Sequence, residues 1–302
     1  MTDERRINRL NDALSKYVFA RPERKQVALS LINAFFAFED TAQLVDFEFL
    51  DRELSPDKRR AKRSHLDVVG ISANGTVTEV EIQVDPLLSM GKRSLYYWTR
   101  LYHRLMRGED YTKLRRTVCI NILAYELFPE KETPDFHNCF GVLNKRHPKQ
   151  MLTDDLEIHF VELPKWERSR PQKWTDMSHL ERWMAYFSNQ TSQKELEEIA
   201  MSDPMIQEAL QAEREFLMDP LLLTEYDLEE DERRDRVARE NYVLQQGRQE
   251  GWQQGRQEGW QQGRQEVALD MLRGKEPLDK IVTYSKLTME QIKQLGKENG
   301  LL

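Results

Sequence analysis

Apolar positions in the first half of the chain follow helical and strand periods in turn. They recur at helical spacing over residues 12–38, where Pro22 marks an interruption. Residues 45–49 alternate with the period of a strand, and residues 65–83 predict two strands joined at an Asn-Gly turn. This part of the chain therefore predicts a helical segment followed by three strands.

The next segments continue the alternation of helix and strand. Residues 89–107 predict an amphipathic helix without a single acidic residue, and Pro86 ends the strand before it. Residues 117–125 form a nearly continuous apolar run, which is typical of a strand covered on both faces. A strand, a helix and another strand suggest a βαβ crossover inside a mixed sheet. We expect two further short strands, near residue 140 and at 157–163.

From Trp174 onward the pattern predicts helices only. The whole chain is thereby divided into four parts. In the last part, two helices flank a short turn, Thr288 caps the second helix and Gly296 ends it. A helical cap or dimerisation module is as consistent with this pair as a DNA-reading element. The parts are an α/β domain (1–170), a helical extension (171–220), a long polar helix (221–272) and a helix-turn-helix-like module (273–302).

The long polar helix contains a repeat. The octet QQGRQEGW begins at residue 245, recurs at 253, and recurs at 261 with its last two residues changed to Val-Ala. A glycine therefore falls at every fourth position from Gly247 to Gly263. Each glycine inside a helix costs about 0.5–1 kcal/mol relative to alanine. The repeat predicts either a close contact between two copies, anchored by Trp252 and Trp260, or a flexible helical linker.

Charge is unevenly distributed along the 302 residues. The net charge is −7, yet residues 1–130 hold 21 Lys and Arg against 19 Asp and Glu. We therefore expect any polyanion to bind the N-terminal half. The longest apolar run, at 29–38, is too short to span a membrane, so no membrane partner is expected. Two cysteines give no disulfide framework, which favours a cytoplasmic location.

Two acids in the 65–83 hairpin raise the question of a metal site. If the turn has two residues, Asp67 faces Ile82 and Glu81 points to the other side of the sheet. If the loop has three residues, 73–75, Asp67 lies directly opposite Glu81. Two carboxylates on one face can hold Mg²⁺ against a phosphate, whereas acids on an exposed hairpin need no such role. The sequence leaves the register open, although the two-residue turn gives a slightly cleaner apolar face.

Several stretches together resemble the Rpn family of recombination-promoting nucleases, also called PD-(D/E)XK nuclease family transposases. The resemblance implies an α/β fold with a PD-(D/E)XK restriction-endonuclease-like core at 1–170, in which helices flank a mixed sheet. An all-α C-terminal region with the long glycine-repeat helix follows. The stretches are NDALSKYVF (11–19), SLINAFF (30–36), HLDVVG (65–70), EVEIQ (79–83), KRSLYYWTRLYHRLMRGEDY (92–111) and LEIHFVELPKW (156–166).

The resemblance also implies roles for single residues. Asp67 and Glu81 would bind Mg²⁺ or Mn²⁺. Gln83 would stand at the last position of the (D/E)XK pattern, where such nucleases usually have a lysine. A neutral glutamine carries no charge, so the missing cation would come from Lys92, Arg93 or Lys16. Asp12 is the best candidate for the acid that the first helix contributes. Asp46 and Glu48 are competing candidates from the first strand.

The function implied is a Mg²⁺-dependent endodeoxyribonuclease that cleaves double-stranded DNA and promotes recombination, as a homodimer or higher oligomer through its C-terminal helices. The alternative is a non-catalytic nuclease fold that binds DNA or a protein and oligomerises in the same way. Phosphate contacts are expected from a basic loop and from the helix at 89–107. The residues concerned are Lys58, Arg59, Arg60, Lys62, Arg63, Lys92, Arg93, Arg100 and Arg104.

Overall fold

A computed structural model describes residues 7–38, 43–50, 68–103 and 110–302. Some of the residues singled out above lie outside these ranges, and their roles stay predictions. They are Asp67, Lys58, Arg59, Arg60, Lys62, Arg63 and Arg104.

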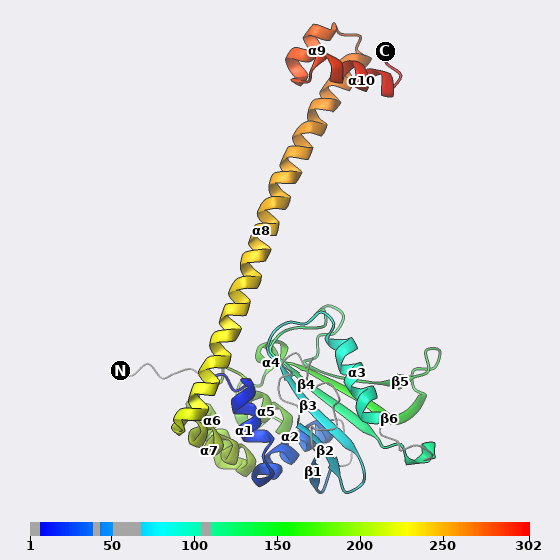
Figure 1. Cartoon of the computed structure of the whole chain (residues 1–302). Helices are drawn as coiled ribbons and strands as arrows, with labels where there is room; N and C mark the ends of the chain where they lie inside the picture. Colours follow the sequence, from blue (N-terminus) through cyan, green and yellow to red (C-terminus); the bar gives the residue numbers. More distant parts are fainter. Residues whose placement is uncertain (1–6, 39–42, 51–67, 104–109) are drawn as a thin grey trace. The chain divides into compact units, whose positions relative to one another are not determined.

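The described part of the N-terminal half is built on a six-stranded mixed sheet, which confirms the predicted class (Figure 1). The strand order is β1-β2-β3-β4-β6-β5, with β3, β4 and β6 parallel and the other pairs antiparallel. The strands are β1 (Phe47–Phe49), β2 (Val68–Ser72), β3 (Val77–Gln83), β4 (Thr117–Leu123), β5 (His137–Leu143) and β6 (Met151–Glu162).

One face of the sheet is covered by a thick helical layer. Its first members are α1 (Asp12–Phe19) and α2 (Lys25–Phe38), with a 3₁₀ turn at Pro22–Arg24 between them, as the proline predicted. The shared core includes Phe35 from α2 together with Val80 and Ile120 from the sheet. Four more helices join this layer: α4 (Leu163–Ser169), α5 (His179–Phe187), α6 (Gln193–Ser202) and α7 (Pro204–Met218).

These four helices cover residues that the pattern assigned mostly to a separate extension. Trp183, Phe187 and Phe216 are buried in the same core as the sheet residues. A compact unit accordingly runs over residues 1–230. Large aromatic side chains at helical spacing mark the buried face of a helix, but they do not say which partner covers it.

The opposite face of the sheet is covered by α3 (Met90–Tyr102), which connects the parallel strands β3 and β4 as the predicted βαβ crossover requires (Figure 1). Its buried side chains include Trp98 and Leu101, which pack with Val77 and Phe160 of the sheet. The Trp98 indole donates to the carbonyl oxygen of Thr117 at 2.9 Å. The apolar cluster on this side is small, and it leaves room for polar side chains.

A second compact unit covers residues 231–302 and contains most of α8 (Pro220–Arg273), α9 (Leu278–Ser285) and α10 (Met289–Glu298). Its small core includes Leu272, Ile281 and Ile292. Thr288 caps α10, as predicted, through a capping box with Gln291. Two 3₁₀ turns complete the described elements, at Tyr111–Lys113 and Trp174–Asp176.

The prediction that Gly296 ends the last helix was wrong, because α10 continues to Glu298. A Cβ atom at position 296 would lie 2.6 Å from the side chain of Leu302. The glycine therefore allows the chain end to fold back onto the helix. It does not serve as a left-handed cap.

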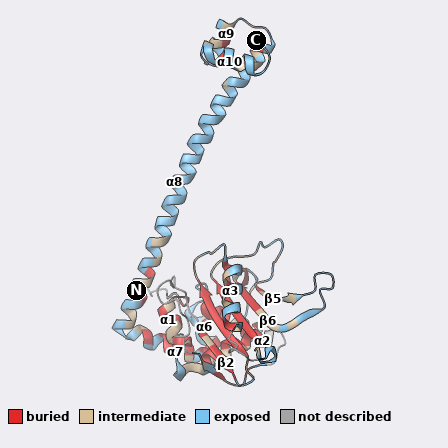
Figure 2. Ribbon diagram, turned by 45° about the vertical axis from the view of Figure 1, so that its right-hand side comes forward, coloured by how far each residue is buried: buried red, intermediate tan, exposed pale blue. Residues whose placement is uncertain are grey.

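The glycine repeat lies in the exposed middle of α8 (Figure 2). Among the described residues, no atom from outside the local helix comes within 4 Å of a Cβ built at any of the five glycines. Trp252 and Trp260 are 64% and 65% exposed. Within the described ranges, no helix is long and apolar enough to cross a membrane.

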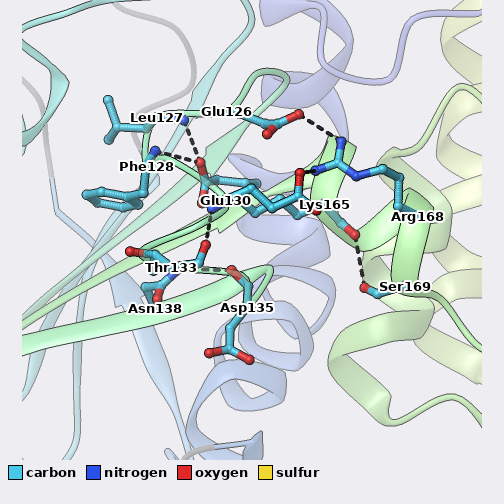
Figure 3. Close-up of polar contacts among 11 residues, drawn as sticks. Glu126, Leu127, Phe128, Glu130, Thr133, Asp135, Asn138, Lys165, Arg168 and Ser169 are labelled. Carbon is cyan, nitrogen blue, oxygen red and sulfur yellow. Dashed lines mark hydrogen bonds and ion pairs between the residues drawn. The ribbon is translucent and has the colours of Figure 1, made fainter.

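A buried ion pair fixes the loop between β4 and β5 to the end of β6 (Figure 3). Glu162 and Lys165 are almost fully buried, and Lys165 Nζ lies 2.7 Å from Glu162 Oε2. The Glu162 carboxylate accepts from the backbone amides of Leu127 and Phe128, and the Lys165 ammonium donates to the carbonyl oxygen of Thr133. Each charge is thereby matched by hydrogen bonds as well as by its partner.

We expect Lys165→Met to lower the free energy of unfolding by about 3–5 kcal/mol, because it leaves the Glu162 carboxylate buried without its cation. The matched control is Arg168→Met, since Arg168 binds Glu126 and Glu130 at a half-exposed position and should cost below about 1 kcal/mol. Urea denaturation of the three proteins measures the difference. Equal costs for the two variants would contradict this account of the loop.

Candidate functional site

The loop between β2 and β3 has three residues. The ladder pairs Val68 with Val80, and the amide of Ser72 donates to the carbonyl oxygen of Thr76 at 3.0 Å. Residues 73–75 form the loop, and Gly75 has a φ of +89°, a left-handed conformation that suits glycine. Of the two registers left open by the sequence, the structure has the one that the metal hypothesis requires.

The apolar face that favoured the two-residue turn does not discriminate between the two registers, because both faces of this sheet are covered by helices. Val68 and Val80 belong to the core under α2, whereas Val69 and Ile71 pack toward α3. Glu81 alternates with Val80 along β3 and so points to the α3 side. The described ladder ends at the pair Val68–Val80, one residue short of Asp67.

A cation from α3 contacts the buried acid of β3. Arg93 Nη2 lies 2.6 Å from Glu81 Oε1, and the Glu81 side chain is only 2% exposed. Arg93 Nη1 also donates to Gln83 Oε1 at 3.4 Å, while the Gln83 amide donates to the carbonyl oxygen of Asp85. Arg93 thus brings a positive charge to both Glu81 and the neutral side chain of Gln83.

The other two candidates for this cation lie elsewhere. Lys92 is exposed on the outer side of α3. Lys16 pairs with Asp12 one turn earlier on α1. Only Arg93, of the three, is seen in contact with Glu81.

Two polar residues near Glu81, Asn121 and Glu79, were missed by the sequence interpretation. Asn121 is paired with Glu81 across the β3–β4 ladder and donates to Ser94 Oγ of α3 at 2.9 Å. Glu79 lies two residues before Glu81 and accepts from the Cys119 thiol at 3.5 Å. The period of a strand could have identified Glu79, because EVEIQ puts both of its acids on one face.

Two neighbouring groups stay in their neutral forms. Burial raises the pKa of the Cys119 thiol well above its usual range, and the Glu79 carboxylate adds to this effect. Burial also raises the pKa of Tyr125 to about 12, with a further contribution from the negative charge of Glu81. Neither Cys119 nor Tyr125 is therefore a thiolate or phenolate near neutral pH.

The acids considered for the first helix and first strand have contacts of their own. Asp12 pairs with Lys16, and α1 belongs to the layer on the sheet face opposite Glu81. Asp46 binds Lys25 at 2.9 Å, and Glu48 is exposed on β1. None of these contacts involves Glu81, and the catalytic role of Asp12 stays a prediction.

The outer side of α3 carries a basic and aromatic stripe. Lys92, Tyr96 and Arg100 follow each other at intervals of four residues and are exposed, with the Arg100 guanidinium 5.8 Å from the Tyr96 ring. The helix contains no acid to balance them. This is a surface on which phosphates can bind and a base can stack.

Glu79, Glu81 and Gln83, which all carry side-chain oxygen atoms, lie on the α3 side of β3. The Glu81 carboxylate and the Gln83 amide oxygen are hard ligands of the kind that Mg²⁺ prefers. The guanidinium of Arg93 can bind phosphate oxygens as well as the carboxylate of Glu81, because both offer acceptor pairs that match its fork of donors.

Comparison with known proteins covers this whole region. The family model described as PD-(D/E)XK nuclease family transposase matches residues 9–242, which contain all six strands and the candidate site. No curated protein and no solved structure matches the chain. The expected resemblance is confirmed over more than three quarters of the sequence, and the chain belongs to the PD-(D/E)XK nuclease family transposases.

Proposed function

We propose that the protein is a Mg²⁺-dependent endodeoxyribonuclease that hydrolyses phosphodiester bonds in double-stranded DNA. The observation that carries the proposal is the buried Glu81 carboxylate, held at 2.6 Å from Arg93 with Gln83 beside it. Charged side chains are rarely fully buried, and buried ionisable groups with a specific charge partner are candidates for functional sites. Membership of a nuclease family supports the same activity.

Asp67 and Glu81 are the proposed metal ligands. If the three-residue register of the hairpin continues by one residue, position 67 stands opposite Glu81. Gln83 offers a neutral oxygen two residues along the same face. A divalent ion bound there would lower the pKa of a water molecule and neutralise charge on the phosphate, which Mg²⁺ and Mn²⁺ can both do.

Arg93 is proposed to neutralise negative charge, first of Glu81 and then of the phosphate, and not to serve as a general base. A guanidinium stays protonated at any physiological pH and forms paired hydrogen bonds with phosphate oxygens. It would compensate Glu81 before DNA binds and then bind the phosphate at the cleavage point. In this proposal the cation that Gln83 cannot supply comes from the next helix.

DNA would lie along the outer side of α3. Lys92 and Arg100 are proposed to bind phosphates on either side of Tyr96. Arg104 and the basic loop that the sequence predicts are proposed to bind further phosphates of the DNA backbone. The loop residues are Lys58, Arg59, Arg60, Lys62 and Arg63.

The C-terminal helices are proposed to form a homodimer or higher oligomer. Trp252 and Trp260 leave most of their surface exposed on a helix whose glycines allow a second backbone to come close. A role in DNA recombination agrees with the transposase description of the family, and a cytoplasmic location is expected from the cysteine content.

A second candidate function is DNA or protein binding without cleavage. The specific observation in its favour is that Gln83 carries no charge and that Arg93 already neutralises Glu81. Such a protein would keep the fold and the basic surface, and it would bind DNA without hydrolysing it.

We expect Glu81→Gln to reduce nicking of supercoiled DNA in Mg²⁺ by at least about 100-fold, because one metal ligand is worth several kcal/mol in the transition state. The matched control is Glu132→Gln, which removes an equal charge at an exposed position. Agarose gels of supercoiled and linear DNA follow the reaction. Nicking that survives Glu81→Gln unchanged would exclude the proposed site, and a wild type that binds DNA and never nicks it would favour the binding module.

Replacing Lys92 and Arg100 together by alanine should weaken DNA binding and reduce the slope of log K against log salt by about 2, since two phosphate contacts are lost. The matched control is Lys194→Ala with Arg214→Ala, which removes the same two residue types from helices on the opposite face. Fluorescence anisotropy at several salt concentrations measures both quantities. Equal slopes in the two double variants would show that DNA does not use α3.

Replacing Trp252 and Trp260 by glutamine in the full chain should convert the oligomer to a monomer, because the variant removes its proposed apolar anchors. Tyr284→Gln is the control, since Tyr284 is equally exposed on α9. Light scattering gives the mass of each protein. A monomeric wild type, or an oligomer in the double variant, would contradict the dimer proposal.

A further inference from the structure

A second group of metal-binding side chains lies on the other face of the sheet. Cys139 of β5 is paired directly with His159 of β6, and Glu157 precedes His159 by two residues on the same face. One donor atom from each residue lies within 4.8 Å of the other two. His159 pairs with Ile120, whose side chain belongs to the core under α2, so the group faces away from Glu81.

The three donor atoms lie close enough to one another to share a single ion. His159 Nε2 lies 3.5 Å from Glu157 Oε2 and 3.9 Å from Cys139 Sγ. A charge-assisted hydrogen bond would be about 2.7–2.9 Å long. Around a tetrahedral zinc ion, the ligand atoms would stand about 3.3 Å and 3.6 Å apart, so small side-chain rotations would close the site.

Surrounding residues already hold two of the three side chains in place. His159 Nδ1 is 3.0 Å from Nε2 of His137, so that Nε2 of His159 remains directed to Cys139 and Glu157. Arg116 binds the other oxygen of Glu157 at 2.6 Å. Such outer contacts orient the ligands in most protein metal sites.

We propose that Cys139, Glu157 and His159 form a zinc site that joins the edge strand β5 to β6, separate from the nuclease site. Thiolate, imidazole and carboxylate together are typical of Zn²⁺, whereas Mg²⁺ takes oxygen ligands only. Three protein ligands leave a fourth position for water or a further group. Cys139 is exposed, so an ion can reach the site from solution.

Cobalt absorption tests this proposal on the full chain, freed of metal by a chelator and kept reduced. Addition of Co²⁺ should produce thiolate-to-cobalt charge-transfer absorption at one equivalent. One equivalent of Zn²⁺ should remove it, and excess Mg²⁺ should not. Cys139→Ser should abolish the band, and His137→Gln should weaken binding about 10–100-fold by removing the contact that orients His159.

Two controls separate this site from the α3 side of the sheet. Cys119→Ser and Glu81→Gln should both keep the band, because Cys119 contacts Glu79 and Glu81 contacts Arg93. Circular dichroism verifies that each variant is folded. No band in the wild type, a band retained by Cys139→Ser, or a band lost in Cys119→Ser would each overturn the zinc site. Any of these results would leave the DNA-cleavage proposal unaffected.

Discussion

The length of one hairpin loop decides which chemistry this sheet can present. Side chains alternate between the faces of a strand, so a shift of one residue would move every side chain of β2 to the other face relative to β3. The three-residue loop, with Gly75 in its left-handed position, pairs Val68 with Val80. It thereby decides which β2 side chains share the α3 side with Glu79, Glu81 and Gln83, which the period of β3 places on one face. The candidate site depends on this register.

The two faces of the sheet differ in how much apolar surface covers them. A large helical layer closes the face under α2, where Val80, Ile120 and Phe35 share one core. The other face is covered by α3 and a smaller apolar cluster, beside which Glu81, Gln83 and Asn121 are buried. A carboxylate can be held there because Arg93 compensates its charge, since an isolated buried charge would cost several kcal/mol.

The helix α3 therefore has two functions in the architecture. Its inner side carries Trp98 into the small core and Arg93 to Glu81, while its outer side presents Lys92 and Arg100. This helix contains no acid and connects the parallel strands β3 and β4. Within a few turns it carries both the partner of the buried acid and the basic surface. That arrangement suits the handling of a polyanion, and it agrees with the nuclease family to which the chain belongs.

The sequence by itself determined the order of the elements, the mixed sheet, the long polar helix and the family. Period, proline positions and apolar runs are local properties of the chain, and they were sufficient for α1 to β4 and for α8. The same local signals named Glu81, and the family resemblance offered Arg93 as one of three possible cations. Only the tertiary structure chose the hairpin register and put Arg93 on Glu81. It alone brought Asn121 beside Glu81, and Cys139 beside His159. These contacts join different strands and helices, and a local pattern does not record which strands become neighbours or in which register they pair.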